Sequence, residues 1–170
     1  MVDSIPYASS IISFGNQTES LIILESKQGN RNEWVSADNV RFLEKNGRIL
    51  RTIGLPSDLY SIDRPKLEFQ DLIERENFVY STYYSFRNPQ LNSLKVEITS
   101  KVIGTDTQKI LGKTMSLILV EESLYSPLIN WKAKNKFWID PNNFFVWKSR
   151  QYISPKLPYI DLEVTKKPAI

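Results

Sequence analysis

The sequence contains no cysteine and no histidine. This excludes disulfides, cysteine nucleophiles, histidine general bases and every metal site that depends on thiolate or imidazole ligands. The six glycines do not cluster, so no glycine-rich phosphate loop is expected. No apolar run is long enough to cross a membrane. We therefore expect no catalytic residues, no metal and no cofactor, although a metal site built only from Asp and Asn oxygens stays open.

The residue mix favours strands over helices. Alanine, the best helix former, occurs only four times, whereas the chain has eight Tyr, eight Phe and four Trp. A length of 170 residues with 41% hydrophobic and 24% charged residues is typical of one globular domain. We expect a single β domain over residues 1–170, with loose ends at 1–6 and 166–170. The net charge of +3 permits weak attraction to anions and does not imply nucleic acid.

Alternating and turn-forming residues predict antiparallel strands. Apolar and polar residues alternate over 78–86 and again over 94–102, as in strands with one wet face. Asn46-Gly47 predicts a tight hairpin, and Asp140-Pro141 predicts a second turn. Pro56 should end a strand, with one helical turn after it. We predict about nine to eleven strands in an all-β antiparallel meander that forms a curved sheet, sandwich or barrel, with little helix.

Aromatic and basic residues near the C-terminus offer the best surface for binding. Trp131, Trp138 and Trp147 are more typical of a core than of an exposed platform for sugars or bases. Three alternate lysines share one face of a strand, either as an anion-facing row or, as we favour, as a charged sheet edge. The candidate contact surface consists of Trp138, Lys132, Lys134, Lys136, Arg150 and Tyr152.

Carboxylate pairs give the main enzymatic alternative. Glu121 and Glu122 should point to opposite faces of a strand, and we expect both to be solvated surface charges. Asp58 and Asp140 are the remaining pair for an enzyme that acts on glycans through two carboxylates. An oligonucleotide-binding β-barrel is a further alternative, which predicts binding of single strands that weakens with salt.

Several motifs resemble one family along most of the chain. The segments that carry the resemblance are Trp34-Val35-Ser36-Ala37-Asp38, residues 46–59 (NGRILRTIGLPSDL), Phe137-Trp138-Ile139-Asp140-Pro141 and Val146-Trp147-Lys148-Ser149-Arg150-Gln151. In this order they are similar to the YjbF-type, or group 4 capsule, lipoproteins encoded in operons for capsule or exopolysaccharide production in Gram-negative bacteria. One departure is Asn143, which stands where the family's final hairpin has glycine.

The resemblance implies a non-enzymatic periplasmic protein anchored to the inner face of the outer membrane by a lipidated N-terminal cysteine. Because this chain has no cysteine, the lipid site would lie upstream of residue 1. Residues 1–4 do not look like the start of a signal peptide. The protein would assist assembly or export of capsule or exopolysaccharide by binding an outer-membrane β-barrel, another protein of the operon, or an acidic polysaccharide. No nucleic-acid partner is expected.

Overall fold

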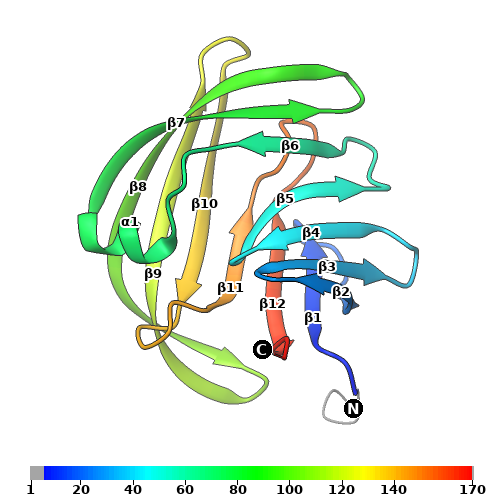
Figure 1. The fold of residues 1–170 in the computed structure, drawn as a ribbon, viewed down its shortest axis with the longest axis vertical. Coiled ribbons are helices and arrows are strands. Elements are labelled where there is room, and N and C mark those ends of the chain that lie inside the picture. Colours follow the sequence, from blue (N-terminus) through cyan, green and yellow to red (C-terminus); the bar gives the residue numbers. More distant parts are fainter. Residues whose placement is uncertain (1–5, 170) are drawn as a thin grey trace.

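The computed structural model describes residues 6–169, which form one antiparallel sheet with a single helix (Figure 1). The strands are β1 (Ser9–Phe14), β2 (Ser20–Gln28), β3 (Arg31–Ser36), β4 (Arg41–Lys45), β5 (Arg48–Ile53), β6 (Leu59–Asp63), β7 (Asn77–Phe86), β8 (Leu91–Ile110), β9 (Lys113–Ser126), β10 (Trp131–Ile139), β11 (Val146–Gln151) and β12 (Ile160–Lys166). The helix is α1 (Phe69–Arg75). The predicted all-β antiparallel fold with little helix is confirmed.

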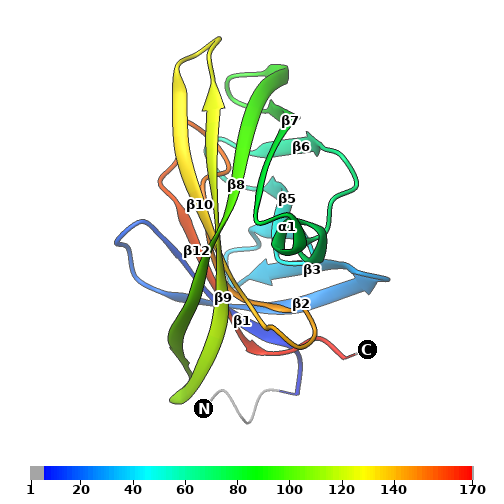
Figure 2. The same ribbon diagram turned by 90° about the vertical axis from the view of Figure 1, so that its left-hand side faces the viewer.

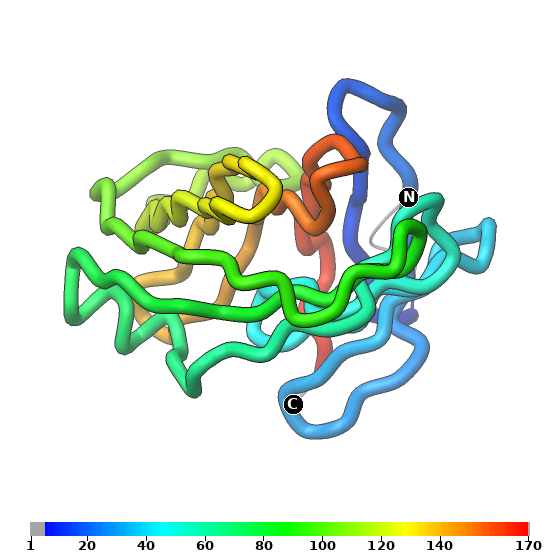
Figure 3. The backbone as a smooth tube through the Cα atoms, turned by 90° about the horizontal axis from the view of Figure 1, so that it is seen from above, coloured from blue at the N-terminus to red at the C-terminus, as the bar shows by residue number. Residues whose placement is uncertain are grey.

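Pairing of the first strand with the last organises the sheet. The 12 strands follow the order β5-β4-β3-β2-β1-β12-β11-β10-β9-β8-β7-β6. All neighbours are therefore consecutive in the chain except β1 and β12, which pair antiparallel. The two end strands, β5 and β6, lie beside each other, so the sheet curls into a nearly closed barrel (Figures 1 and 2). Seen from above, β6–β7 and β9–β10 run along opposite sides of the interior (Figure 3).

Alternating side chains fill this interior. On β7, Tyr80, Tyr84 and Phe86 are buried, whereas Val79 and Tyr83 point outward and are exposed. The same alternation buries Leu94, Val96 and Ile98 on β8. Strands with one apolar face place that face against a shared core. The predicted alternation over 78–86 and 94–102 is confirmed.

Tight turns join the strands at the predicted places. Asn46 and Gly47 both have positive φ, at 50° and 86°, as a two-residue hairpin between β4 and β5 requires. In the β10–β11 turn, the Asn142 N–H donates to Asp140 Oδ1 at 2.9 Å. Here Phe144, at φ 59°, adopts the left-handed conformation. The left-handed residue of this turn is therefore Phe144, one position after Asn143, and the hairpin forms with asparagine in place of the family's glycine.

The helix lies where the sequence analysis expected none. Residues 54–57 form bends, and β6 begins two residues later, so the helical turn predicted after Pro56 is wrong. Instead α1 begins after Glu68, whose N–H donates to Asp71 Oδ2 at 2.9 Å. Phe69 and Leu72 are buried against the core, as expected for an amphipathic turn. Within residues 6–169, no helix is long and apolar enough to span a membrane.

The predicted loose ends fall partly outside the described part of the chain. Residues 1–5 and 170 are not described, and Tyr7 is exposed before β1 begins at Ser9. Lys166 is the last residue of β12 and so belongs to the sheet.

Candidate functional site

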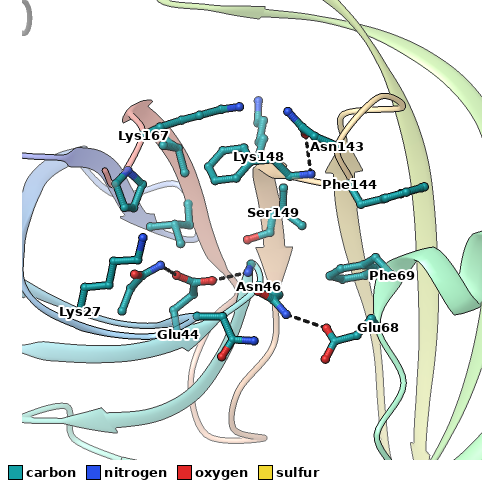
Figure 4. Close-up of a pocket in the computed structure, with 18 of the residues that line it drawn as sticks. Lys27, Glu44, Asn46, Glu68, Phe69, Asn143, Phe144, Lys148, Ser149 and Lys167 are labelled. Atoms are coloured by element: carbon teal, nitrogen blue, oxygen red, sulfur yellow. Dashed lines mark hydrogen bonds between the residues drawn. The ribbon is translucent and has the colours of Figure 1, made fainter. Parts of the chain in front are cut away.

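A cleft of about 570 Å³ opens at the end of the barrel where three turns meet the start of α1 (Figure 4). The turns are β2–β3, β4–β5 and β10–β11, and the segment after β12 completes the wall. The polar lining consists of Asn30, Asn32, Asn46, Gln70, Asn143, Ser149, Glu44, Glu68, Lys27, Lys148 and Lys167, and the aromatic lining of Trp34, Phe69, Phe144 and Phe145. Concave sites of this size with aromatic walls and a few polar groups are typical of ligand binding.

Glu44 is a buried acceptor in this cleft. Asn32 Nδ2 donates to its Oε2 at 2.8 Å, and Trp34 Nε1 donates to the same atom at 3.3 Å. The Gly47 N–H donates to the other oxygen. Burial raises the pKa of Glu44 above its ordinary value, although the three hydrogen bonds oppose the shift. No Lys or Arg within residues 6–169 pairs with this carboxylate, so no cation compensates the charge that it carries when it is ionised.

Asn32 stands beside Glu44 with one polar atom unused. The two residues are directly opposite in the β3–β4 ladder. The Asn32 amide nitrogen is held by Glu44, but its Oδ1 is buried and accepts no hydrogen bond. We call Asn32, Trp34 and Glu44 the floor of the cleft. A buried acceptor without a donor costs about 1–3 kcal/mol, so this atom favours a ligand or water that donates to it.

Three lysines line the cleft at different places. Figure 4 shows Lys148 and Lys167 across from Glu44, with Lys27 at one side. The Lys167 ammonium lies 4.3 Å from the Phe145 ring centroid and 4.5 Å from that of Trp147. The Lys27 ammonium donates to the Ala169 carbonyl. Lys148 is paired with an acid, because its Nζ lies 3.8 Å from the Glu163 carboxylate.

A buried ion pair supports the cleft from inside the barrel. Glu122 is fully buried, and both of its oxygens accept from Arg48, one of them at 2.7 Å from NH1. Tyr80 OH donates to the same carboxylate at 2.9 Å. The guanidinium stacks 4.4 Å from the centroid of Phe69, a cleft residue, and 4.7 Å from that of Phe137. Burial alone would raise the pKa of Glu122, but the charge and hydrogen bonds of Arg48 lower it below its ordinary value.

The six residues of the predicted contact surface lie away from the cleft, and none of them lines it. Lys132, Lys134 and Lys136 share the outer face of β10, with the last two 3.4 and 3.5 Å from Glu121. Lys136 has strands on both sides, because β11 pairs with β10 from Lys136 onward, whereas Lys132 and Lys134 pair with β9 alone. The favoured interpretation as a charged sheet edge is therefore consistent with Lys132 and Lys134, and it does not hold for Lys136.

The other members of that surface are engaged in local contacts. Arg150 forms two hydrogen bonds of 2.8 Å with Asp161 and stacks 3.9 Å from the Tyr159 ring centroid. Tyr152 packs edge-on against the same tyrosine at 5.8 Å. The structure therefore brings Arg150 and Tyr152 together, and Arg150 is opposite Lys136 in the β10–β11 ladder.

The Trp138 side chain lies on the outer face of the barrel but is largely buried there. It is 9% exposed and packs with Ile110 and Leu117 in a small outer cluster beneath the β8–β9 hairpin. Its Nε1 donates to Asp106 Oδ2 at 2.7 Å. Trp131 is buried in the main core, and Trp147 is partly buried in the outer cluster. These aromatic residues are mainly packing groups, as the sequence analysis favoured.

The carboxylates singled out for catalysis have local roles. Asp58 accepts from Thr52 Oγ1 at 2.9 Å and from the Gly54 N–H at 3.0 Å, which fixes the β5–β6 turn. Asp140 stabilises the β10–β11 turn and accepts from Trp147 Nε1 at 3.3 Å. The expectation that Glu122 is a solvated surface charge is wrong, because Arg48 compensates it within the core.

The cleft residues were missed because they come together only in the fold. One signal was present in the sequence. Glu44 follows Phe42 at a spacing of two in a strand, which places a carboxylate on an apolar face just before the Asn46-Gly47 turn. In the part of the chain that the structure describes, no group of three or more acidic residues is arranged to hold a metal ion.

Comparison with known proteins places the chain in a family. A model of the family described as group 4 capsule polysaccharide lipoprotein gfcB, YjbF matches residues 1–165. The chain belongs to this family. Its resemblance to the group 4 capsule lipoproteins is thereby confirmed. The lipoprotein GfcB of Escherichia coli (strain K12) is 24% identical over 173 residues, covering 97% of this chain and 78% of that relative. The lipoprotein YjbF of the same strain is 19% identical over 156 residues, covering 89% and 72%.

A solved structure has the same fold as this chain. The crystal structure of the lipoprotein YmcC from Escherichia coli (K12) superposes with a TM-score of 0.87 at 19% sequence identity. The match covers 99% of this chain and 88% of that one. The nearly closed antiparallel barrel with its first strand paired to its last is therefore shared with YmcC, and at this identity the likeness shows the fold alone.

Proposed function

We propose that this chain is the periplasmic part of an outer-membrane lipoprotein and assists capsule or exopolysaccharide assembly or export by holding a stretch of polymer in the cleft. Membership of the group 4 capsule polysaccharide lipoprotein family supports the cellular role. The observation that carries the molecular role is the cleft itself, whose aromatic rings and side-chain amides are the groups that bind sugars. Apolar ring faces cover the C–H faces of a sugar, and amides exchange hydrogen bonds with its hydroxyls.

The arrangement of the cleft carboxylates supports binding over bond cleavage. Hydrolysis of a glycoside uses two carboxyl groups with freedom to exchange protons across the scissile bond. Glu44 is held by three donors, and Glu68 accepts from Asn46 Nδ2 at 2.6 Å and lies 3.6 Å from the Lys45 ammonium. Both carboxylates are therefore engaged in hydrogen bonds or ion pairs that stabilise the lining of the cleft. The proposed role is non-enzymatic.

A binding experiment with two sets of variants tests this proposal. The purified chain is titrated with polymer isolated from the producing strain, with heat of binding and tryptophan fluorescence as readouts. Trp34 on the cleft floor is one of the four tryptophans that contribute to this fluorescence. Phe144→Ala and Phe145→Ala, each checked for an intact melting temperature, should lower affinity at least about tenfold. Lys132→Ala with Lys134→Ala on the outer face should leave affinity unchanged.

Other results of the binding experiment would place polymer contact on another surface or refute polymer binding. Loss of binding only in the β10 lysine variant would transfer polymer contact to the surface predicted from sequence. Polymer that fails to bind any folded form would refute polymer binding. Co-purification with an outer-membrane protein of the same operon would then make that protein the partner. Release of shortened polymer by the wild-type chain, lost in Glu44→Gln or Glu68→Gln, would establish catalysis.

A further inference from the structure

We infer that the cleft selects a sugar residue bearing an anionic substituent, carboxylate or phosphate, with that substituent at the ammonium of Lys27 or Lys167 and a hydroxyl of the ligand donating to Asn32 Oδ1. This inference rests on the proposed polymer-binding function and adds the chemical class of the ligand. Two independent features carry it: an unused acceptor at the floor, and two cations in the lining, Lys27 on the side of Glu44 and Lys167 across from it, that pair with no acid within residues 6–169 (Figure 4).

The floor determines which hydrogen-bonding group the ligand must present. The Asn32 side chain cannot rotate its amide by 180° without placing Oδ1 against the Glu44 carboxylate, which now accepts from Nδ2 at 2.8 Å. Its Oδ1 is therefore fixed as an acceptor, and it is buried without a donor. Glu44 is a second acceptor beside it. Two neighbouring acceptors require donors, and sugar hydroxyls supply them, whereas an anionic group at the floor would be repelled.

The lysines in the lining determine which charged group the ligand must present. Lys45, Lys134, Lys136 and Lys148 each lie within 4 Å of a carboxylate. By contrast, Lys27 donates to a backbone carbonyl and Lys167 lies over two aromatic rings, and neither ammonium pairs with an acid within residues 6–169. An anionic substituent beside either ammonium would form charge-assisted hydrogen bonds, which are about twice as strong as neutral ones.

The two sides together exclude simpler ligands. A neutral sugar would satisfy the floor and leave both lysines without an anion. A small inorganic anion would satisfy the lysines and leave Asn32 Oδ1 without a donor. A sugar with an acidic substituent matches both sides at once, and the rings of Phe144 and Phe145 lie in the lining that it would occupy.

Chemical neutralisation of the polymer tests the inference. Polymer from the producing strain is compared with samples that are carboxyl-reduced or dephosphorylated, by calorimetry on the full chain. Affinity should fall at least about tenfold when the anionic groups are removed, and which treatment causes the fall identifies the group. The double variant K27Q/K167Q should lose the same factor on native polymer and nothing on neutralised polymer. Added salt should weaken only the native interaction.

Two control variants separate charge at the cleft from net charge and from the floor. K132Q/K134Q makes the same change in net charge on the outer face of β10 and should leave affinity unchanged. Asn32→Leu, with its melting temperature measured, should weaken native and neutralised polymers alike, because hydroxyl donation does not depend on the acid.

The outcomes distinguish this inference from the proposed function. Equal binding of native and neutralised polymer, or a polymer whose composition includes no acidic group, would overturn the inference and leave polymer binding intact. Equal losses in K27Q/K167Q and K132Q/K134Q would overturn the placement of the anion at the cleft. Absence of binding by every polymer sample would overturn both proposals.

Discussion

The buried ion pair between Arg48 and Glu122 is expected to dominate the stability of the barrel interior. Glu122 is fully buried and Arg48 is 8% exposed, so water screens neither charge. Removing one partner of such a pair leaves an uncompensated charge and costs about 3–5 kcal/mol. Glu122→Gln should therefore lower the free energy of unfolding by about 3–5 kcal/mol, a large share of the about 5–15 kcal/mol typical of a domain.

The glutamine amide cannot replace all the hydrogen bonds that the Glu122 carboxylate accepts. The carboxylate now accepts two hydrogen bonds from Arg48 and one from Tyr80. A glutamine has one acceptor oxygen and turns an N–H group toward donors. The guanidinium keeps its charge between Phe69 and Phe137, where ring faces compensate it only in part. Replacing both partners, as in Arg48→Met with Glu122→Leu, removes the charge altogether and should restore part of the lost stability.

Urea denaturation followed by tryptophan fluorescence measures these differences, and pH adds a second readout. Because Arg48 outweighs burial, the folded pKa of Glu122 is lowered from the ordinary value of 4.5. The unfolded state therefore takes up the proton first, so the contribution of Glu122 is present above pH 4.5 and is lost as pH falls through the folded pKa. The stability gap between wild type and Glu122→Gln should close over the same range.

Either of two results would refute this reasoning. The first is a loss below about 1 kcal/mol in Glu122→Gln, which would place the site among weakly coupled surface pairs. The second is a double variant no more stable than the single one, because the cost would then come from lost packing and not from an unpaired charge.

Three further changes test the turns, the outer cluster and the cleft floor. Gly47→Ala should lower the melting temperature more than Gly29→Ala, because a Cβ at Gly47 would come within 2.4 Å of Val146, whereas one at Gly29 meets nothing within 4 Å. For Gly29→Ala the positive φ alone predicts a loss of about 1–2 kcal/mol, and equal losses at both sites would contradict the clash. Trp138→Phe removes the indole hydrogen bond and should cost about 1 kcal/mol in urea denaturation without changing polymer affinity, and lost affinity at full stability would return Trp138 to the contact surface. Burial raises the pKa of Glu44, so carbon-detected NMR should show that its carboxyl group titrates above the ordinary value of 4.5. The contribution of Glu44 to the free energy of unfolding should be present below pH 4.5 and be lost as pH rises through the folded pKa. A folded pKa at or below 4.5 would contradict this prediction.

Local sequence signals predicted most of the strands. Period-two alternation needs only a sheet with one buried face, and it identified β7 and the first half of β8. Asn46-Gly47 identified the β4–β5 hairpin, because few other residue pairs adopt positive φ at both positions. The family resemblance, carried by motifs in order along the chain, is confirmed over residues 1–165.

Features that depend on distant partners were not predictable in this way. The β1–β12 pairing joins residues about 150 positions apart in the chain and makes β5 and β6 the end strands of the sheet, which local patterns cannot indicate. Glu122 looks like any charged residue until Arg48, 74 residues away, is placed beside it. The short helix α1 is set by burial of Phe69 and Leu72 against the barrel, a tertiary effect that overrides weak helix propensity.

The same long-range contacts make binding and stability inseparable at the cleft. Gln151 Nε2 donates to the Gly47 carbonyl at 2.9 Å, and its Oε1 accepts from the Ile49 N–H at 3.0 Å, so β11 fixes the β4–β5 turn that forms one wall. Phe69 forms another wall and packs on the Arg48 guanidinium. A change at the Arg48–Glu122 pair therefore reaches two walls at once. Glu122→Gln should weaken polymer binding even where the chain remains folded, although Glu122 itself does not line the cleft.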